Sequence, residues 1–241
     1  MTIRIAMWSG PRNLSTAMMR SFGSRSDTFV SDEPFYGCFL KETGAGHPMR
    51  EEVIAAMNCD WQSVMSSLRV ETPDGSPIWY QKHMWHHMTG PIGYEDFEGF
   101  RHAFLIRDPE RMIASYLRKR EAARFEDFGL DRQAEFFERE ADRLGHAPPV
   151  IDANDVLADP EAVLSKLCTA LGIKWEPGML SWTPGRRGTD GPWAPHWYGA
   201  VEKSKGFGPP EMDTIELPVD ARRVAERCRP YYDRLAVFRI R

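Results

Sequence analysis

The segment from Ile3 to Phe22 constrains the fold of this 241-residue chain more than any other. An apolar run ends at Trp8, a Gly-Pro turn follows, and the hydroxyl residues Ser15 and Thr16 open a stretch of helix-forming residues. This order predicts a buried strand from Ile3 to Trp8, a tight loop, and a helix from about Thr16 to Phe22. Such a helix N-terminus attracts anions, because its first backbone N–H groups have no partner within the helix and the helix dipole is positive there.

Arg12 lies inside this loop and adds a planar fork of hydrogen-bond donors suited to phosphate or sulfate oxygens. The stretch from Gly10 to Thr16 is shorter than a Walker A loop and lacks the lysine of that motif. The loop therefore favours a phosphorylated ligand but not the magnesium chemistry of an NTPase. The same residues also fit an ordinary strand-to-helix turn capped by Ser15.

Length and charge exclude several classes of protein. The chain is long enough for one sizeable core, and we expect a single domain over residues 1–241. A net charge of −4 does not favour nucleic acid or an anionic membrane as a partner. No run of 18 apolar residues and no secretory leader pattern is present, so we expect a cytoplasmic protein. We expect no metal, because the cysteines lack CxxC spacing.

Short apolar runs alternate with helical patterns along the rest of the chain. Strands are expected over 29–31, 78–82, 103–106 and 150–151. Helices are expected over 51–69, 109–117, 160–171 and 220–235. Residues 177–218 lack periodicity, but their several aromatic residues predict an ordered functional loop. The alternation predicts an α/β fold with three αβα layers around a central, mostly parallel sheet.

A second anion site is expected after the strand 103–106. Arg107 ends that strand, Asp108 and Pro109 start the following helix, and Ser115 lies eight residues after Arg107. A guanidinium and a hydroxyl from adjacent elements could thus hold one more anion. Taken separately, Arg107 could instead pair with a surface carboxylate, and Ser115 could be an ordinary helix serine.

Together these segments resemble the sulfotransferase family that uses 3′-phosphoadenosine-5′-phosphosulfate (PAPS). In that family a Pro-(Lys/Arg)-Ser-Gly-Thr-Thr loop binds the 5′-phosphosulfate, and an Arg and a Ser eight residues apart hold the 3′-phosphate. The resemblance covers 3–34 and 103–173, with a weaker likeness near 203–207. It implies a P-loop-like phosphosulfate-binding loop and a 3′-phosphate pair, in two positive pockets at neighbouring strand ends. The residues implied to bind the nucleotide are Gly10, Arg12, Asn13, Leu14, Ser15, Thr16, Arg107 and Ser115.

The chain departs from the family pattern at two loop positions. Leu14 stands where the family has glycine, so the backbone there is expected to lack glycine's conformational freedom. Ala17 replaces the aromatic residue that stacks on adenine in cytosolic phenol and steroid sulfotransferases. Trp193, Trp197 or Phe207 could supply that surface instead.

A basic segment matches the place where the family closes a loop over the nucleotide. It contains Lys203, Lys205 and Gly206, and it could equally be a solvated charged turn. Arg186 and Arg187 are weaker candidates for the same role.

Two residues are candidates for the base that takes the acceptor's proton. Glu33 ends the second strand, and its place after Arg12 resembles that of the catalytic glutamate of tyrosylprotein and some bacterial sulfotransferases. Partial burial would raise its pKa towards the range of an efficient base. The alternative is an acid at a helix start, with Pro34 at the first helical position.

His83 is the competing base, because Lys82 and His83 resemble the Lys-Thr-His segment of cytosolic sulfotransferases without its threonine. There the lysine assists at the phosphosulfate. His83, His86 and His87 could instead be metal ligands, but no carboxylate or cysteine completes such a site.

The resemblance implies transfer of a sulfuryl group from PAPS, by in-line displacement, to a hydroxyl or amine of a small or amphiphilic acceptor. The alternatives are a P-loop kinase using ATP and magnesium, and an inactive nucleotide-binding relative. Residues 35–75 and 120–148 are expected to shape the acceptor pocket through Phe35, Tyr36, Phe39, Phe125 and Phe128. The sequence leaves the acceptor and the oligomeric state open.

Overall fold

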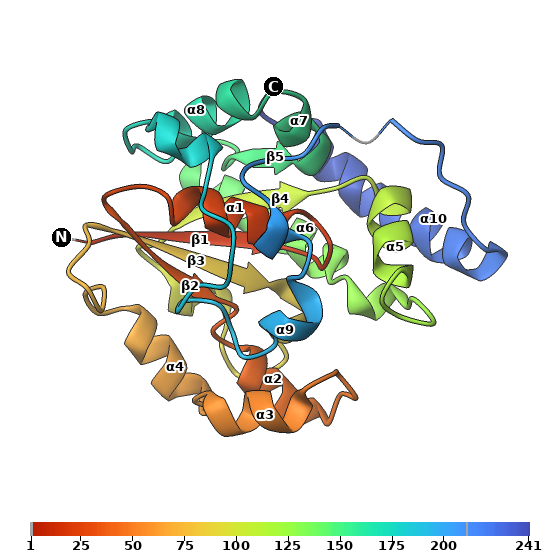
Figure 1. Cartoon of the computed structure of the whole chain (residues 1–241), viewed down its shortest axis with the longest axis horizontal. Coiled ribbons are helices and arrows are strands. Elements are labelled where there is room, and N and C mark those ends of the chain that lie inside the picture. Colours follow the sequence, from red (N-terminus) through yellow and green to blue (C-terminus); the bar gives the residue numbers. More distant parts are fainter. Residues whose placement is uncertain (1, 211) are drawn as a thin grey trace.

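In the computed structural model, which describes residues 2–210 and 212–241, five parallel strands form a central sheet (Figure 1). The strand order is β2-β3-β1-β4-β5. The strands are β1 (Ile3–Ser9), β2 (Thr28–Asp32), β3 (Ile78–Met84), β4 (Arg101–Ile106) and β5 (Val150–Asp152). Each coincides with or slightly extends a strand expected from the apolar runs.

Helices cover both faces of this sheet, and they confirm the predicted three-layer α/β fold (Figure 1). The helices on the first face are α1 (Ser15–Phe22), α2 (Tyr36–Thr43), α3 (Arg50–Ala56), α7 (Ala153–Ala158) and α8 (Pro160–Ala170). The helices on the second face are α4 (Trp61–Leu68), α6 (Leu130–Leu144) and α10 (Val219–Ala236). Helix α5 (Pro109–Leu117) packs against α10, and α9 (Ala194–Trp197) is a single turn.

Strand alternation assigns each side chain to one face of the sheet. On β1, Met7 belongs to the core of the first face and Trp8 to that of the second. On β3, Tyr80 faces the first core and Trp79 the second. Successive side chains of a strand point to opposite faces. Lys82 therefore shares the face of Tyr80.

Two features of the helices differ from the sequence predictions. The segment 51–69, expected as one helix, is broken at Met57, whose backbone is extended, and α4 starts after Asp60. The Asp60 side chain accepts a hydrogen bond from Ser63 N, so a local N-cap divides the apolar pattern into two helices. Helices α2, α6 and α7 are not among the helices that the sequence pattern predicts.

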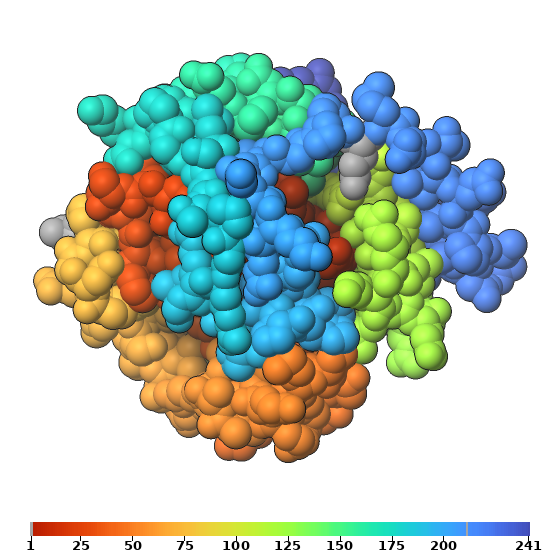
Figure 2. All heavy atoms as spheres, viewed as in Figure 1, coloured from red at the N-terminus to blue at the C-terminus, as the bar shows by residue number. Residues whose placement is uncertain are grey.

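The described residues 177–210 and 212–218 have little regular structure, as expected. They contain the short turns η4 (Pro177–Leu180) and η5 (Val201–Lys203) besides α9. Three of their aromatic residues, Trp182, Trp193 and Tyr198, are buried. We call residues 182–208 the strap, since they cross one side of the molecule in Figures 1 and 2.

Three further 3₁₀ turns lie outside the strap: η1 (Trp85–His87), η2 (Tyr94–Phe97) and η3 (Phe125–Asp127). The aromatic residues expected around the acceptor divide between two environments. Phe125 and Phe128 lie in a core formed with α5 and α10, and Phe35 lies in the core of the second sheet face. Among the described residues, no helix is long and apolar enough to cross a membrane.

Candidate active site

A cavity of about 610 Å³ lies at the carboxyl ends of the strands. Its walls include the loop after β1, the residue after β2, the end of β3, the residue after β4, the end of α5 and the strap. Figure 2 shows N-terminal residues, in red, recessed between the strap and the green segment that contains α5. Ligands of parallel α/β sheets bind at this edge, so the cavity is where a ligand is expected.

The loop after β1 presents an uncapped helix N-terminus. Arg12 and Leu14 adopt left-handed backbone conformations, with φ of 63° and 67°. Leu14 thus takes the conformation expected to need glycine, which corrects our reading of this departure from the family. Among the described residues no side chain caps α1, so the alternative of a turn capped by Ser15 is not found. The first N–H groups of α1 therefore have no side-chain partner.

Four loop residues implied to bind the nucleotide line the cavity, and two support the loop from behind. The lining residues are Arg12, Leu14, Ser15 and Thr16. Asn13 is buried, and its Nδ2 donates to Leu105 O at 3.4 Å, which ties the loop to β4. Gly10 permits close packing, because a Cβ there would lie 2.9 Å from Phe128 O.

The structure brings the two expected anion sites into one cavity. Arg12 Nε donates to Ser115 Oγ at 3.2 Å, and Arg107 donates to the backbone carbonyl of Arg12. All three residues line the same cavity. Burial lowers the pKa of Arg12, and the charges of Arg107 and Arg118 lower it further. The residues expected in two separate positive pockets therefore line one cavity, in which Arg12 contacts both Arg107 and Ser115.

Glu33 lies at the cavity with its side chain almost entirely buried. Its Oε1 is 2.8 Å from Lys82 Nζ, and its backbone has a φ of 45°. Burial raises the pKa of Glu33, the Lys82 charge opposes this, and Asp32 reinforces it. Helix α2 begins at Tyr36, so Pro34 is not the first residue of a helix and Glu33 does not cap one.

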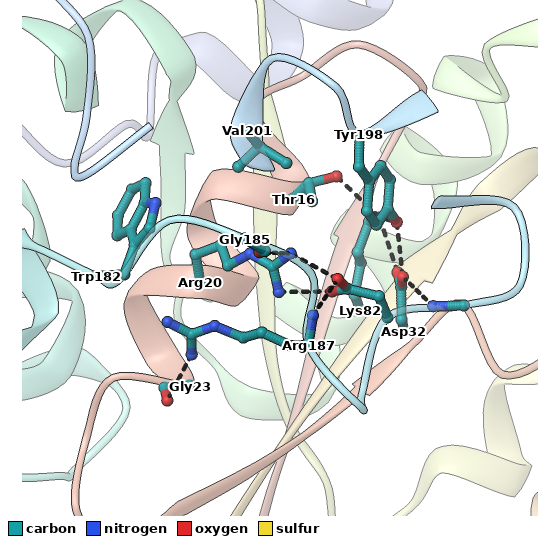
Figure 3. Close-up of polar contacts among 12 residues, drawn as sticks. Thr16, Arg20, Gly23, Asp32, Lys82, Trp182, Gly185, Arg187, Tyr198 and Val201 are labelled. Atoms are coloured by element: carbon teal, nitrogen blue, oxygen red, sulfur yellow. Dashed lines mark hydrogen bonds and ion pairs between the residues drawn. The ribbon is translucent and has the colours of Figure 1, made fainter. Parts of the chain in front are cut away.

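Lys82 is the centre of a buried polar network that includes Asp32, Thr16 and Tyr198 (Figure 3). Its Nζ donates to Asp32 Oδ1 at 2.9 Å, to the Tyr198 hydroxyl at 2.7 Å, and to Thr16 Oγ1 at 3.2 Å. Burial alone would lower the pKa of Lys82, but Asp32 and Glu33 raise it well above its ordinary value. Lys82 stays charged, and it joins the base candidate, the α1 loop and the strap.

The same network anchors the strap over the cavity. The Tyr198 hydroxyl donates to Asp32 Oδ2 at 2.7 Å and accepts from Trp193 Nε1 at 3.0 Å. Further along the strap, Asp190 forms a buried two-bond ion pair with Arg20 of α1, at 2.5 and 2.7 Å (Figure 3). The strap is therefore an integral wall of the cavity.

His83 does not reach the cavity. It lies on the second face of the sheet, stacked on Trp8 with ring centroids 4.7 Å apart, and its Nε2 is 3.2 Å from Gln81 Oε1. Burial lowers its pKa to about 3. The alternation of β3 explains this, because the strand that directs Lys82 towards Glu33 directs the next residue away.

His87 is a cavity residue that the sequence reasoning did not select as a base or binding residue. Its Nδ1 lies 3.7 Å from Glu33 Oε2 and has no hydrogen-bond partner among the described residues. The ring is held between Tyr36 and Phe39, at centroid distances of 4.4 and 4.9 Å. The sequence feature that could have indicated His87 is the group of histidines at positions 83, 86 and 87, at the end of β3 and directly after it.

Two further histidines complete an aromatic wall beside Glu33. His47 Nδ1 is 2.9 Å from the Tyr36 hydroxyl, and His86 packs against His87. Burial lowers the pKa of His47 to about 4 and that of His86 to about 3. These imidazoles are neutral near pH 7, so this wall offers weak dipoles and aromatic faces. Of the aromatic residues expected here, Tyr36 and Phe39 line the cavity.

The strap supplies every candidate for the adenine surface. Trp193, Trp197 and Phe207 all line the cavity. Trp193 is buried and bonded to Tyr198, whereas Trp197 and Phe207 are partly exposed.

Of the basic segment that was expected to close over the nucleotide, only part lies at the cavity. Gly206 lines the cavity and bridges to Ser181, and a Cβ there would lie 2.8 Å from Leu180 O. The side chains of Lys203 and Lys205 are exposed and do not line it. Neither do the other basic candidates: Arg186 is exposed, and Arg187 donates to Gly23 O at 3.1 Å, away from the cavity.

No group of three or more His, Cys, Asp and Glu side chains within residues 2–210 and 212–241 is arranged to hold a metal ion. The four cysteines are free.

Comparison with known proteins agrees with the likeness seen in the sequence. A family model described as a sulfotransferase domain matches residues 3–237. Two Arabidopsis thaliana proteins, named branched-chain-amino-acid aminotransferase-like proteins 2 and 1, are 34% and 35% identical over 229 residues. The match covers 95% of this chain but 40% and 41% of those proteins. The chain thus spans about two fifths of the length of these relatives.

Solved structures share the fold at low sequence identity. The sulfotransferase domain of the Synechococcus PCC 7002 olefin synthase superposes with a TM-score of 0.53 at 15% identity, covering 94% of both chains. The sulfotransferase domain of the curacin biosynthetic pathway gives 0.54 at 20%, covering 94% of this chain and 97% of that one. A sulfotransferase from Alicyclobacillus acidocaldarius gives 0.57 at 14%, covering 98% and 95%.

Proposed function

Because this chain belongs to the sulfotransferase domain family, we propose that it transfers a sulfuryl group from PAPS. The acceptor in this proposal is a hydroxyl or amine of a small or amphiphilic molecule. One observation carries the proposal. The uncapped α1 loop, the Arg107–Ser115 pair and the buried carboxylate of Glu33 meet in a single cavity. The proposal keeps the expectations of a single domain over 1–241, a cytoplasmic location and no metal or nucleic-acid partner.

The donor end of the cavity fits a doubly phosphorylated nucleotide. The first N–H groups of α1 have no side-chain partner, and Arg12 stands beside them. These groups would bind the 5′-phosphosulfate. Arg107 and Ser115 would bind the 3′-phosphate and supply binding energy remote from the reacting bond. Arg12 contacts Ser115 and can therefore bridge the two phosphates.

The reaction requires one proton transfer and one displacement at sulfur. The acceptor oxygen forms a bond to sulfur while the bond from sulfur to the 5′-phosphate oxygen breaks, and 3′-phosphoadenosine 5′-phosphate (PAP) leaves. Glu33 takes the acceptor proton, and its raised pKa makes it a stronger base than an exposed glutamate. Arg12 and the α1 N–H groups stabilise the negative charge that develops on the leaving phosphate. Lys82 holds the Glu33 carboxylate in place.

The proposal differs from the two alternatives in what the protein binds and converts. A kinase would need ATP and magnesium, and membership of the sulfotransferase family argues against it. An inactive relative would bind PAP without transferring sulfate. The buried Glu33 beside the loop favours an active enzyme.

Calorimetry and mass spectrometry test the proposal in two steps. PAP should bind in the presence of EDTA, and ATP with magnesium should bind at least about tenfold more weakly. Incubation with PAPS and a panel of alcohols, phenols and amines should then yield PAP together with a sulfated product. Preferred binding of ATP with magnesium would overturn the proposal. So would PAP binding without transfer to any member of the panel.

A further inference from the structure

Arg120 lies at the cavity, held between two segments that are distant in sequence. Its Nη1 donates to Gly46 O, at 3.4 Å, in the loop between α2 and α3. Its guanidinium also lies over the ring of Trp197, 5.5 Å from the centroid, at the end of α9. These two contacts fix the direction of the side chain, so its fork of donors is oriented before any ligand arrives.

The charge of Arg120 has no ion-pair partner among residues 2–210 and 212–241. Its Nε is buried and has no hydrogen-bond partner there. Burial raises the pKa of Tyr116, the charge of Asp127 raises it further, and the charge of Arg120 lowers it. A buried donor on a charged group costs stability unless a ligand or water satisfies it. The arrangement therefore indicates an anion that is absent from the protein itself.

Arg120 contacts a different set of residues from the arginines proposed for the donor site. After burial, the charges of Arg107 and Arg118 lower the pKa of Arg12. The charge of Arg120 instead acts on the groups near Glu33. After burial, it is what lowers the pKa of His47 to about 4.

A chain of contacts leads from Glu33 to Arg120. Tyr36 N donates to Glu33 O at 3.0 Å, and the Tyr36 hydroxyl is 2.9 Å from His47 Nδ1. The residue before His47 is Gly46, which accepts the hydrogen bond from Arg120. The aromatic wall thus separates the base from the cation. An acceptor whose hydroxyl meets Glu33 would lie along this wall and reach Arg120 with its far end.

We propose that the acceptor is a hydroxy compound with an anionic group, a carboxylate in the first place, that pairs with Arg120. This inference rests on the proposed sulfotransferase function and specifies its substrate class. A carboxylate matches the guanidinium fork with two parallel hydrogen bonds, which a neutral ester cannot form. Arg120 thereby determines specificity, while Glu33 and the donor loop carry out the transfer.

The test uses matched pairs of probes with the full chain. Hydroxycarboxylates of graded length, aromatic and aliphatic, are compared with their methyl esters, and transfer from PAPS is followed by mass spectrometry. The wild type should favour acids over esters, and Arg120→Met should reduce kcat/KM for the acids about 10- to 100-fold, with little change for the esters. Arg120→Lys should retain part of the preference. PAP affinity and thermal stability should change little.

Arg124→Met is the matched control, since Arg124 is an exposed arginine of the same segment that does not line the cavity. It should behave as the wild type. Retained acid preference in Arg120→Met, equal use of acids and esters by the wild type, or no sulfated acid despite PAP binding would each overturn the inference. A drop in PAP affinity with unchanged acid preference would assign Arg120 to the donor and also overturn it. Failure of the wild type to bind PAP would instead refute the proposed function.

Discussion

The two ends of the cavity are built on opposite principles. At the donor end, Arg12, Arg107 and the first N–H groups of α1 present permanent positive charge. At the proposed acceptor end, Glu33 lies beside the charged Lys82. The wall next to it consists of Tyr36, Phe39 and imidazoles that burial keeps neutral. In our proposal the positive wall binds phosphate, while burial keeps the pKa of Glu33 raised against the opposing charge of Lys82. The separation lets one cavity bind an anion and keep a base.

The largest expected effect comes from removing the base. Glu33→Gln keeps the shape and the contact with Lys82 but cannot accept a proton, so kcat should fall about 10²- to 10⁴-fold. PAP affinity, measured by calorimetry, should change by less than about twofold, because the donor end is untouched. Glu126→Gln is the control, since Glu126 is an exposed acid that lines the same cavity. Equal losses of PAP affinity and kcat would contradict the division of the cavity.

The pH dependence follows from the direction of the shift at Glu33. Its pKa is raised from 4.5, so transfer by the wild type should decline as pH falls through that raised pKa. The folded chain binds this proton more tightly than the unfolded chain does, so stability decreases as pH rises from the unfolded to the folded pKa. The melting temperature of Glu33→Gln relative to the wild type should therefore rise with pH over that interval. A flat difference would show that burial does not govern Glu33.

The proposed 3′-phosphate contacts of Arg107 and Ser115 should determine which nucleotides the protein binds. Arg107→Met should weaken PAP binding about 10- to 100-fold and leave adenosine 5′-phosphate, which lacks the 3′-phosphate, nearly unaffected. Ser115→Ala should have the same selectivity with a smaller loss. Arg107 also donates to the backbone carbonyl of Arg12. Equal losses for both nucleotides would show that Arg107 acts by holding the loop.

The hydrogen-bond network around the Tyr198 hydroxyl is expected to hold the strap in place over the cavity. Tyr198→Phe removes a hydroxyl that makes hydrogen bonds with Asp32, Lys82 and Trp193, and it should lower the free energy of unfolding by about 1–3 kcal/mol. Tyr231→Phe, at a partly buried tyrosine outside this network, should change it by less than about 0.5 kcal/mol. Urea unfolding measures both. Equal effects would mean that the network does not hold the strap.

The smallest effect is expected at Leu14. Leu14→Gly removes a side chain held at a φ of 67° in favour of the residue that adopts this conformation without strain. The backbone that binds the phosphate is unchanged, so PAP affinity should stay within about threefold. A large loss, measured by calorimetry, would show that the Leu14 side chain itself contacts the nucleotide.

The fold was largely readable because its signals are local. Apolar runs marked the strands, and Asp108 with Pro109 marked the start of α5, as the structure confirms. The break at Met57 escaped prediction, because the apolar spacing continues across it while an Asp60 side chain begins a new helix. Helix α6 was also missed, although Phe136 and Phe137 bury its inner face.

The sequence by itself determined the strand, loop and helix that make the anion site, and the eight-residue step from Arg107 to Ser115, because both depend on neighbours along the chain. Only the tertiary structure decided that Lys82 and Glu33 share the cavity while His83 faces away, because alternation fixes which residues lie on opposite faces but not which face meets the ligand. The raised pKa of Glu33 and the place of Arg120 likewise arise from segments that meet only in the folded chain, where burial and distant charges act together.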